Sequence, residues 1–432
     1  MRNRIARALA LAAVLGACGS DRGAERESER LRAAVDSMLP ALARLASLPV
    51  LEEVRLERRD SAAVRAFVER QLDRELPPDV LASVHATWTL LGLIPDTLDL
   101  RALMLRLYSE QIVGYYDPDE RTLYVVEGVA ADGVAPVLAH ELVHALQDQH
   151  ADLDSLIARE RGTDRQTAAH AALEGHATVT MFAWLAEQAA GGPVDPAALP
   201  DPAEQLAAGL RAQNDQFPVF RSAPLVIRES LLFPYVAGAR FVHQLWQTRP
   251  DTRPAPLGEW LPQSTEQVLH PEAAFLERRS ELLPLRIGGD RGAWRALGDD
   301  DGFGEFQTSV FLEQHLGADA RAAARGWAGD VYRLLVTTGG ERALLWYSVW
   351  DDEEAAARFA GALGSVQRAR PDWRLDVTQG AVADRPALRV LLSRSGAAPV
   401  AAALPPVCLD SAGSCVELIQ PPRPCSGAPG GC

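Results

Sequence analysis

Lysine is absent from this sequence of 432 residues, and all 43 basic residues are arginine. A P-loop needs a lysine to reach the phosphates of a nucleotide, and a Schiff-base enzyme needs a lysine amine as its nucleophile. Both classes of chemistry are therefore excluded. Long hydrophobic runs are also missing: no stretch after the N-terminus approaches the ~20 apolar residues that a membrane-spanning helix requires. We therefore expect no transmembrane helix.

Acidic side chains outnumber basic ones, and the formal net charge is −15 at pH 7. Nucleic acid and anionic membrane surfaces attract proteins through basic patches. We therefore expect neither as a partner. Loss of residues 1–17 would strengthen this conclusion, because that segment contains three arginines and no acidic residue.

The motif H-E-L-V-H, from His140 to His144, is the most informative feature that is present. Residues four apart on a helix project from the same face, so both imidazoles can point at one metal ion. Glu141 faces the same cavity, where it can act as a general base toward a water molecule. The motif therefore predicts two metal ligands and a catalytic carboxylate within one helical turn.

The residues around this motif favour a buried site over a chance match on a surface helix. Apolar residues precede the motif at 134–139 and continue through Leu142, Val143 and Leu146. A helix that is apolar around most of its circumference is buried. Buried polar groups without partners cost about 1–3 kcal/mol each, and a metal ion would provide partners for them. We therefore expect a metal site.

Several residues are candidates for the third ligand. His150 has the spacing of the metzincin pattern, but Gln147 replaces the glycine that would end the helix there, so His150 would lie on another face. Glu174 lies in an expected long helix, and a carboxylate from a second helix would complete a His₂Glu site with one open position. His170 and His176 are its rivals, and either histidine can instead orient a ligand. We favour Glu174.

The sequence just upstream of the motif predicts a turn and a strand. The string D-P-D at 117–119 is a turn signal, and the run from Thr122 to Val126 is rich in β-branched and aromatic residues. An exposed strand edge offers backbone donors and acceptors to an extended peptide.

Two strings resemble the gluzincin branch of the zincin metallopeptidases, especially its compact bacterial members. They are H-E-L-V-H-A-L-Q-D-Q-H, which ends at His150, and A-L-E-G-H-A, which contains Glu174. The segment 114–126 also fits, because in such enzymes a turn and an edge strand precede the active-site helix and line the substrate groove. The resemblance covers about residues 80–275. It departs at His176, where similar sequences carry an acidic residue.

This resemblance implies one catalytic zinc ion, bound by His140, His144 and Glu174. It also implies that Glu141 takes a proton from the attacking water and passes it to the leaving amine of a polypeptide substrate. A further donor usually stabilises the developing oxyanion. The candidates for this donor are Tyr235, Tyr115, Tyr116 and His243, and the sequence does not choose among them.

The first residues have the pattern of a processing signal. Three arginines within the first seven residues precede a short apolar stretch, and the string L-G-A-C ending at Cys18 resembles the lipobox of bacterial lipoproteins. The resemblance implies that Cys18 is acylated and anchors the chain to a lipid bilayer outside the cytoplasm. Gly19, in place of an aspartate, favours an outer-membrane or cell-surface location. The alternative is an ordinary secretory signal with an incidental cysteine.

The other four cysteines lie in the last 25 residues, at Cys408, Cys415, Cys425 and Cys432. An even number of cysteines in an exported chain predicts two disulfides, and three pairings are possible. A zinc knuckle is the alternative, but it is disfavoured because no two of these cysteines have the C-x-x-C spacing.

Patterning along the chain predicts an α+β protein. Helices are expected at about 54–75, 79–92, 98–110, 166–189, 203–215, 228–247, 303–327 and 352–363, and strands at about 330–337, 342–350, 372–378 and 387–393. The expected parts are a signal peptide at 1–17, a tether and first helix at 18–50, a mainly helical zincin-like metallopeptidase domain with a small edge-strand sheet at 51–280, a smaller C-terminal α+β domain at 285–400, and a cysteine-rich tail at 401–432.

These observations lead to a functional hypothesis. We expect a membrane-anchored, zinc-dependent peptidase that acts outside the cytoplasm, with Glu141 as its general base. The alternative is a surface lipoprotein that uses the same scaffold only to bind a metal or a protein. The presence of Glu141 favours the enzyme, because a site that only binds metal needs no base.

Overall fold

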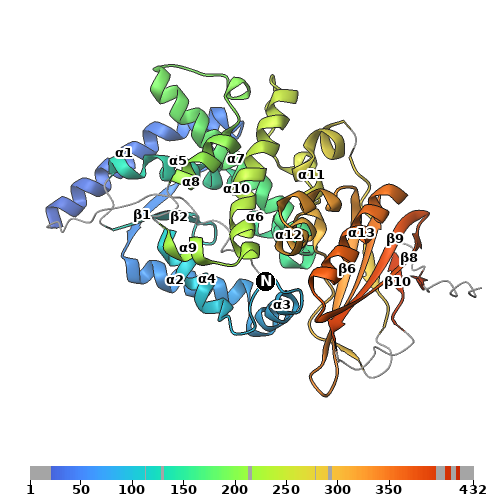
Figure 1. The fold of residues 1–432 in the computed structure, drawn as a ribbon. Helices are drawn as coiled ribbons and strands as arrows, with labels where there is room; N and C mark the ends of the chain where they lie inside the picture. Colours follow the sequence, from blue (N-terminus) through green and yellow to red (C-terminus); the bar gives the residue numbers. More distant parts are fainter. Residues whose placement is uncertain are drawn as a thin grey trace, which may run out of the picture. The chain divides into compact units, whose positions relative to one another are not determined.

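The computed structural model describes residues 21–111, 113–127, 131–212, 217–277, 279–289, 294–395, 404–409 and 415–418. These residues form two compact units. The first unit takes its residues from Met1–Ala82 and Ile94–Ser280, and the second from Ser83–Leu93 and Glu281–Cys432. The first is mainly helical with a small sheet, whereas the second is built on a larger sheet (Figure 1). The protein is thus an α+β protein of two parts, as the sequence predicts.

The helices of the first unit follow the expected order along the chain. They are α1 (Asp21–Leu45), α2 (Ser61–Glu75), the start of α3 (Pro78–Leu90), α4 (Leu100–Gln111), α5 (Ala131–His150), α6 (Leu153–Leu156), α7 (Thr163–Ala190), α8 (Pro202–Ala212), α9 (Pro218–Ser222), α10 (Leu225–Thr248) and α11 (Thr265–Leu269). Among the described residues, no helix combines the length and apolar character needed to span a bilayer.

A three-stranded sheet lies just before α5 in the chain. Its order is β1 (Arg55–Arg59), β3 (Thr122–Val126), β2 (Gly114–Asp117). The predicted turn forms between β2 and β3, where Asp117 Oδ1 accepts hydrogen bonds from the backbone N–H groups of Asp119 and Glu120. The strand over Thr122–Val126 is confirmed, but its expected place at the edge is wrong. It is the central strand, because β1 pairs with it in parallel and β2 in antiparallel fashion.

The predicted helix at 54–75 is wrong over its first residues, which form β1. The side chain of Asp60 accepts a hydrogen bond from Ala63 N and caps α2, so the helix begins at Ser61. The charged residues before Asp60 are tolerated because β1 lies at the edge of the sheet. Arg59, for example, lies 3.6 Å from the ring centre of Tyr124 and donates a hydrogen bond to Tyr115 Oη.

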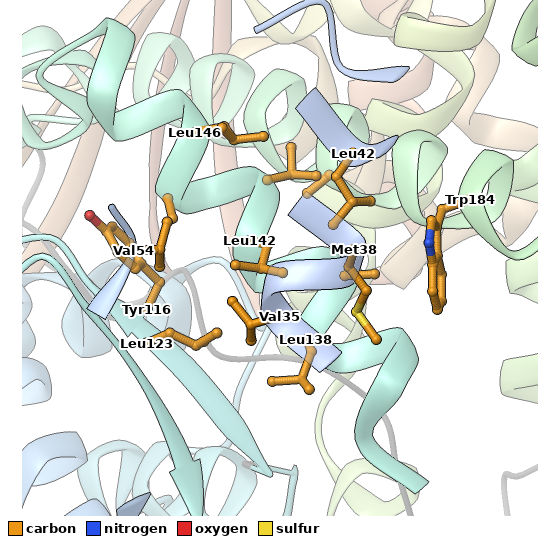
Figure 2. Packing of buried hydrophobic residues seen from close by; sticks show 14 of the residues in the cluster. Val35, Met38, Leu42, Val54, Tyr116, Leu123, Leu138, Leu142, Leu146 and Trp184 are labelled. Carbon is orange, nitrogen blue, oxygen red and sulfur yellow. The ribbon is translucent and has the colours of Figure 1, made fainter. Parts of the chain in front are cut away.

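The main hydrophobic core of the first unit lies between α1, α5 and the small sheet (Figure 2). From α5, Leu138, Leu142 and Leu146 enter this core, and each is buried. They meet Val35, Met38 and Leu42 of α1, Val54, Leu123 and Tyr116 near or in the small sheet, and Trp184 of α7. The first helix expected within residues 18–50 is thus present as α1, and it forms part of the core.

Helix α7 packs against α5 and also against α10. The contact with α10 is close enough to require two glycines. A Cβ atom built on Gly175 would lie 2.1 Å from the backbone of Gly238, and one built on Gly238 would lie 1.9 Å from Ala171 O. Any larger side chain at either position would push the two helices apart. The glycine after Glu174 is therefore explained by helix packing.

The boundary between the two units falls inside α3. Residues 83–93 belong to the second unit, although the sequence places them within the predicted 51–280 domain. Three of their backbone or side-chain groups form hydrogen bonds with later residues of the second unit. Ser83 Oγ donates to Leu297 O, while Leu91 O and Thr89 O accept hydrogen bonds from His315 and Arg394. The second boundary between the units, between Ser280 and Glu281, lies where the sequence places the end of the 51–280 domain.

The second unit contains an antiparallel five-stranded sheet of order β5-β6-β7-β9-β8. Its elements are β4 (Leu285–Ile287), β5 (Arg295–Ala296), α12 (Gly304–Leu316), β6 (Trp327–Val336), β7 (Arg342–Trp350), α13 (Glu353–Ala369), β8 (Trp373–Val382), β9 (Arg385–Arg394), β10 (Val407–Leu409) and β11 (Cys415–Val416). Alternate residues of β7 face opposite sides. Trp346 and Trp350 contact Phe359 of α13, while Tyr347 Oη donates to Pro405 O near the small β11-β10-β4 sheet.

Two predictions for this unit need correction or completion. The helix expected at 303–327 ends at Leu316, because Gly317 adopts a φ of 91°, and a short 3₁₀ segment then leads into β6. The tail contains a disulfide between Cys408 and Cys415, which face each other across β10 and β11. This pairing excludes a zinc knuckle that uses these two residues. Cys425 and Cys432 lie outside the described residues.

Asp330 of β6 is a buried carboxylate that joins α12 to the sheet. It accepts hydrogen bonds from the backbone N–H groups of Phe303 and Gly304 and from the indole N–H groups of Trp327 and Trp346, at 2.8–3.0 Å. Burial raises the pKa of Asp330 to about 6, although these four donors partly oppose the shift. The folded protein thus retains a proton here at a pH at which an unfolded aspartate has lost it.

We expect Asp330→Asn to change how stability depends on pH. Between pH ~4 and ~6 the folded wild-type chain binds more protons at this residue than the unfolded chain, so its unfolding free energy decreases as pH rises, by up to about 1.4 kcal/mol per pH unit. Asparagine does not titrate. The unfolding free energy of the wild type minus that of the variant should therefore fall from pH 4 to pH 7. Urea unfolding followed by tryptophan fluorescence measures both values.

Asp319→Asn is the matched control, because Asp319 is exposed on the surface of the same unit. Its stability should follow the wild-type curve at every pH. If the curves of wild type and Asp330→Asn run parallel, the raised pKa of Asp330 is contradicted.

Candidate metal centre

Helices α5 and α7 bring together three groups that can bind a metal, and we call them the metal triad: His140, His144 and Glu174. The Nε2 atom of His140 lies 3.0 Å from Glu174 Oε2 and 3.1 Å from His144 Nε2. The third separation, between His144 Nε2 and Glu174 Oε2, is 3.4 Å. All three side chains are buried. Among the described residues, no other such group of histidine, cysteine and acidic side chains is found.

The spacing of the metal triad fits a tetrahedral zinc ion. Zinc binds histidine nitrogen and carboxylate oxygen at about 2.0–2.2 Å, which places two tetrahedral ligand atoms about 3.3 Å apart. The observed separations of 3.0, 3.1 and 3.4 Å bracket that value. Two imidazoles and one carboxylate are also a donor set that zinc accepts. Three protein ligands leave one of the four positions for water or substrate.

Glu141 lies next to the metal triad in the sequence and is fully buried. Its Oε2 atom accepts a hydrogen bond of 2.9 Å from the backbone N–H of Tyr116. Tyr116 belongs to β2, and this N–H points away from the partner strand β3 and toward α5. The small sheet therefore fixes the orientation of the Glu141 carboxylate.

The charges of the metal triad are coupled. Burial alone would raise the pKa of Glu174, but His144, His140 and His170 together hold it well below its ordinary value. Burial lowers the pKa of His140, and the hydrogen bond to Glu174 only partly offsets this effect. An ionised carboxylate at Glu174 and a neutral imidazole at His140 are protonation states that metal binding requires.

His170 lies one helical turn before Glu174 on α7. Its Nε2 atom is 3.1 Å from Glu174 Oε1, the oxygen that does not face the other histidines. His170, a rival candidate for the third ligand, is not part of the metal triad and contacts the other oxygen of the Glu174 carboxylate. This contact orients Glu174 Oε2 toward His140 and His144.

His150, the alternative third ligand in the metzincin spacing, is placed elsewhere. Helix α5 continues to this residue without a break, and His150 Nε2 lies 2.8 Å from Pro49 O. His176 is fully buried, and its two ring nitrogens lie near Ala46 O and Gln147 Nε2. Burial lowers the pKa of His176 to about 3, so this side chain is neutral at ordinary pH. Neither histidine belongs to the metal triad.

The second half of the motif attaches α5 to its surroundings. Asp148 accepts a hydrogen bond from Tyr116 Oη at 3.0 Å. The side-chain oxygen of Gln149 accepts from the backbone N–H groups of Leu51 and Glu52, and its amide nitrogen donates to Glu52 O. These bonds join the segment after α1 and strand β2 to the helix that carries the histidines.

The candidates for an oxyanion donor differ in their distance from the metal triad. The ring of Tyr235 in α10 lies 6.1 Å from the ring of His140. Tyr115 stacks on Phe67 of α2, and Tyr116 contributes a backbone N–H to Glu141. His243 also lies in α10, and burial lowers its pKa. The ring of Tyr235 thus lies close to the ring of a member of the metal triad.

Sequence reasoning missed two groups at this centre. One is the backbone N–H of Tyr116, which no side-chain pattern can reveal. The other is Gln147, whose Oε1 atom lies 2.9 Å from His144 Nδ1. The sequence identified Gln147 only as the residue that replaces a glycine. Its position three residues after His144 places both on one helix face, and that spacing was the available signal.

One comparison with known proteins gives a match. Residues 295–406 match a family model described as a domain of unknown function (DUF8575). This segment contains the five-stranded sheet with α12 and α13 of the second unit. No curated protein and no solved structure matches the chain significantly. The family match lies outside α5 and α7, which carry the metal triad.

Substitutions can test which residue is the third ligand. Glu174→Gln keeps the size of the side chain but replaces a charged oxygen by a weaker neutral one. Zinc affinity should fall by at least ~100-fold, more than the loss of an orienting contact usually causes. His150→Gln should bind zinc as tightly as the wild type, because His150 bonds to Pro49 O. Competition with a chromogenic chelator measures both affinities, and the opposite ranking would reject Glu174 as a ligand.

Proposed function

We propose that this protein is a zinc-dependent peptidase that hydrolyses peptide bonds in polypeptides. The observation that carries the proposal is the convergence of three buried donor atoms from α5 and α7, with a buried carboxylate on Glu141, the residue that follows His140 in the chain. Bound in this centre, zinc would polarise the scissile carbonyl and lower the pKa of a water molecule.

Glu141 supplies the proton transfers of this proposed reaction. Its carboxylate takes a proton from the attacking water as the oxygen forms a bond to the carbonyl carbon. The same proton then passes to the amide nitrogen as the carbon–nitrogen bond breaks, so the leaving group departs as a neutral amine. The hydrogen bond from Tyr116 N holds the Glu141 carboxylate in place for both transfers.

Strand β2 supports a polypeptide as the substrate class. The Tyr116 N–H, which faces α5, shows that the side of β2 away from β3 is turned toward Glu141. An unpaired strand edge offers backbone donors and acceptors to an extended peptide chain, and the Tyr116 N–H of this edge is already bonded to Glu141. We propose that the rest of this edge takes the role that the sequence assigned to Thr122–Val126.

Glu141→Gln tests the enzyme against the alternative of a module that only binds metal or protein. The amide cannot accept the proton, so we expect proteolysis to fall by at least ~100-fold while zinc still binds at one ion per chain. Cleavage of a diverse peptide library, with and without chelator, measures activity, and zinc content is measured on the same preparations. Unchanged turnover in the variant would reject Glu141 as the base.

A second control separates a lost base from a lost fold. Glu266→Gln changes a buried carboxylate on α11, which is not part of the metal triad, and should keep both zinc and activity. If the wild-type protein binds zinc but cleaves no peptide, the non-catalytic alternative is supported.

We also propose that Cys18 is acylated and anchors the protein to a bilayer outside the cytoplasm. The support is the sequence of the first eighteen residues together with the disulfide between Cys408 and Cys415, a bond typical of exported proteins. Cys18 itself lies outside the described residues. Nucleic acid is not expected as a partner, because the net charge is −15.

Metabolic labelling in a bacterial host tests the anchor. The wild-type chain should incorporate labelled fatty acid and stay with the membrane fraction after a high-salt wash, because two or more acyl chains bind a bilayer stably. Cys18→Ser should incorporate no label and leave the membrane fraction. Label in the Cys18→Ser variant would show that the modified residue lies elsewhere.

A further inference from the structure

A chain of hydrogen bonds leads from the residue after α1 to the metal triad. Its first link joins Ala46 O to His176 Nε2, at 3.1 Å. The second joins His176 Nδ1 to Gln147 Nε2, at 3.1 Å, and the third joins Gln147 Oε1 to His144 Nδ1, at 2.9 Å. The three side chains are exposed by no more than 1% of their surface, so water does not compete for these bonds.

Backbone carbonyl oxygens fix the direction of the first two links. A carbonyl oxygen only accepts, so the His176 Nε2 atom that faces Ala46 O must carry a hydrogen. Nδ1 of the neutral ring is then an acceptor, and Gln147 must turn its NH₂ group toward it. The same NH₂ group lies 3.0 Å from Leu173 O, another acceptor. Both neighbours therefore require the same orientation of the Gln147 amide.

This orientation determines the tautomer of His144. The oxygen of the Gln147 amide faces His144 Nδ1, and because this oxygen only accepts, Nδ1 must carry the hydrogen. In the neutral ring, the free lone pair is then on Nε2. That atom is the one that lies 3.1 Å from His140 Nε2 and 3.4 Å from Glu174 Oε2.

We propose that Gln147 and His176 are positioning residues that fix His144 in the tautomer with a free Nε2 lone pair, ready to bind the metal ion. The identity of that ion rests on the proposed function, whereas the hydrogen-bond chain does not. A histidine without such a partner divides its population between two tautomers, and only one of them can bind a metal through Nε2. Loss of an orienting partner of this kind typically weakens metal binding 10–100-fold.

The proposal makes sense of two departures in the sequence. Gln147 stands where the metzincin pattern has a glycine, and His176 stands where gluzincin-like sequences are expected to carry an acidic residue. In this chain the two residues contact each other, so each supplies the partner that the other needs. Gln147 contacts His144 directly, and His176 acts on His144 through Gln147.

The experiment measures tautomers and zinc affinity, and neither needs turnover. Nitrogen-15 NMR of the imidazole rings in the metal-free protein should show His144 protonated at Nδ1 and His176 at Nε2. Gln147→Leu should weaken zinc binding by ~10–100-fold in chelator competition, and His176→Leu should weaken it less, because the Gln147 amide keeps its bond to Leu173 O. His176→Gln provides both a donor and an acceptor and should restore affinity to within ~3-fold of wild type.

Thr180→Val is the matched control for polar groups buried in α7. Thr180 lies one turn after His176, is fully buried, and its hydroxyl has no hydrogen-bond partner among the described residues. The variant should bind zinc like the wild type. Circular dichroism identifies any variant that fails to fold, and the NMR measurement on the wild-type protein stands without variants.

Two results would overturn the proposal. One is a metal-free wild-type protein with His144 protonated at Nε2. The other is folded His176→Gln that binds zinc as weakly as His176→Leu, which would show that His176 acts only by filling space. If the tautomers and affinities behave as expected but no peptide is cleaved, the proposed peptidase function fails and the positioning role of Gln147 and His176 is upheld.

Discussion

Packing of α5 on two sides holds the candidate metal centre in place. One side is apolar and inserts Leu138, Leu142 and Leu146 into the core formed with α1 and the small sheet. Burial of each such leucine contributes about 1.5–3 kcal/mol. The other side carries the polar groups of the motif toward α7. Because the apolar side fixes the helix, the polar side can hold charged and hydrogen-bonding groups in the protein interior. Each such buried group would destabilise the fold by about 1–3 kcal/mol if it had no partner.

The approach of α7 is fixed by its other neighbour. Gly175 and Gly238 let α7 and α10 meet at backbone distance, so α7 is held between α10 and α5. Glu174, one residue before Gly175, is thereby directed at the two histidines of α5. The same helix carries His170, which contacts Glu174, and His176, which contacts Gln147. Helix packing and ligand orientation are thus parts of one arrangement.

The sequence predicts local features of this fold well because they follow from spacing. The i, i+4 separation of His140 and His144 places them on one face, and the apolar residues around them indicate burial. The position of Glu174 was harder to predict, because its contact with α5 joins residues that are 30 or more positions apart in the sequence. For that reason the spacing left His170 and His176 as alternatives. Their actual partners, Glu174 Oε1 and Gln147, are visible only in three dimensions.

The errors have physical causes of the same kind. Arg55–Arg59 has the composition of a helix surface, and only its parallel pairing with β3 makes it a strand. The helix expected to reach residue 327 is stopped by the positive φ of Gly317. Likewise, Thr122–Val126 has the pattern of a strand, but the pattern does not say how many neighbours a strand has. Sequence periodicity describes an element, whereas its partners are decided by tertiary contacts.

The division of α3 between the two units has a consequence for the order in which the chain can fold. Residues 83–93 form hydrogen bonds with groups such as His315 and Arg394, which lie more than two hundred residues further along the chain. Contacts of such long sequence separation form slowly, because a long loop must close first. Leu90, Leu91 and Leu93, which are buried in the finished protein, therefore have no native cover until the C-terminal part of the second unit has folded.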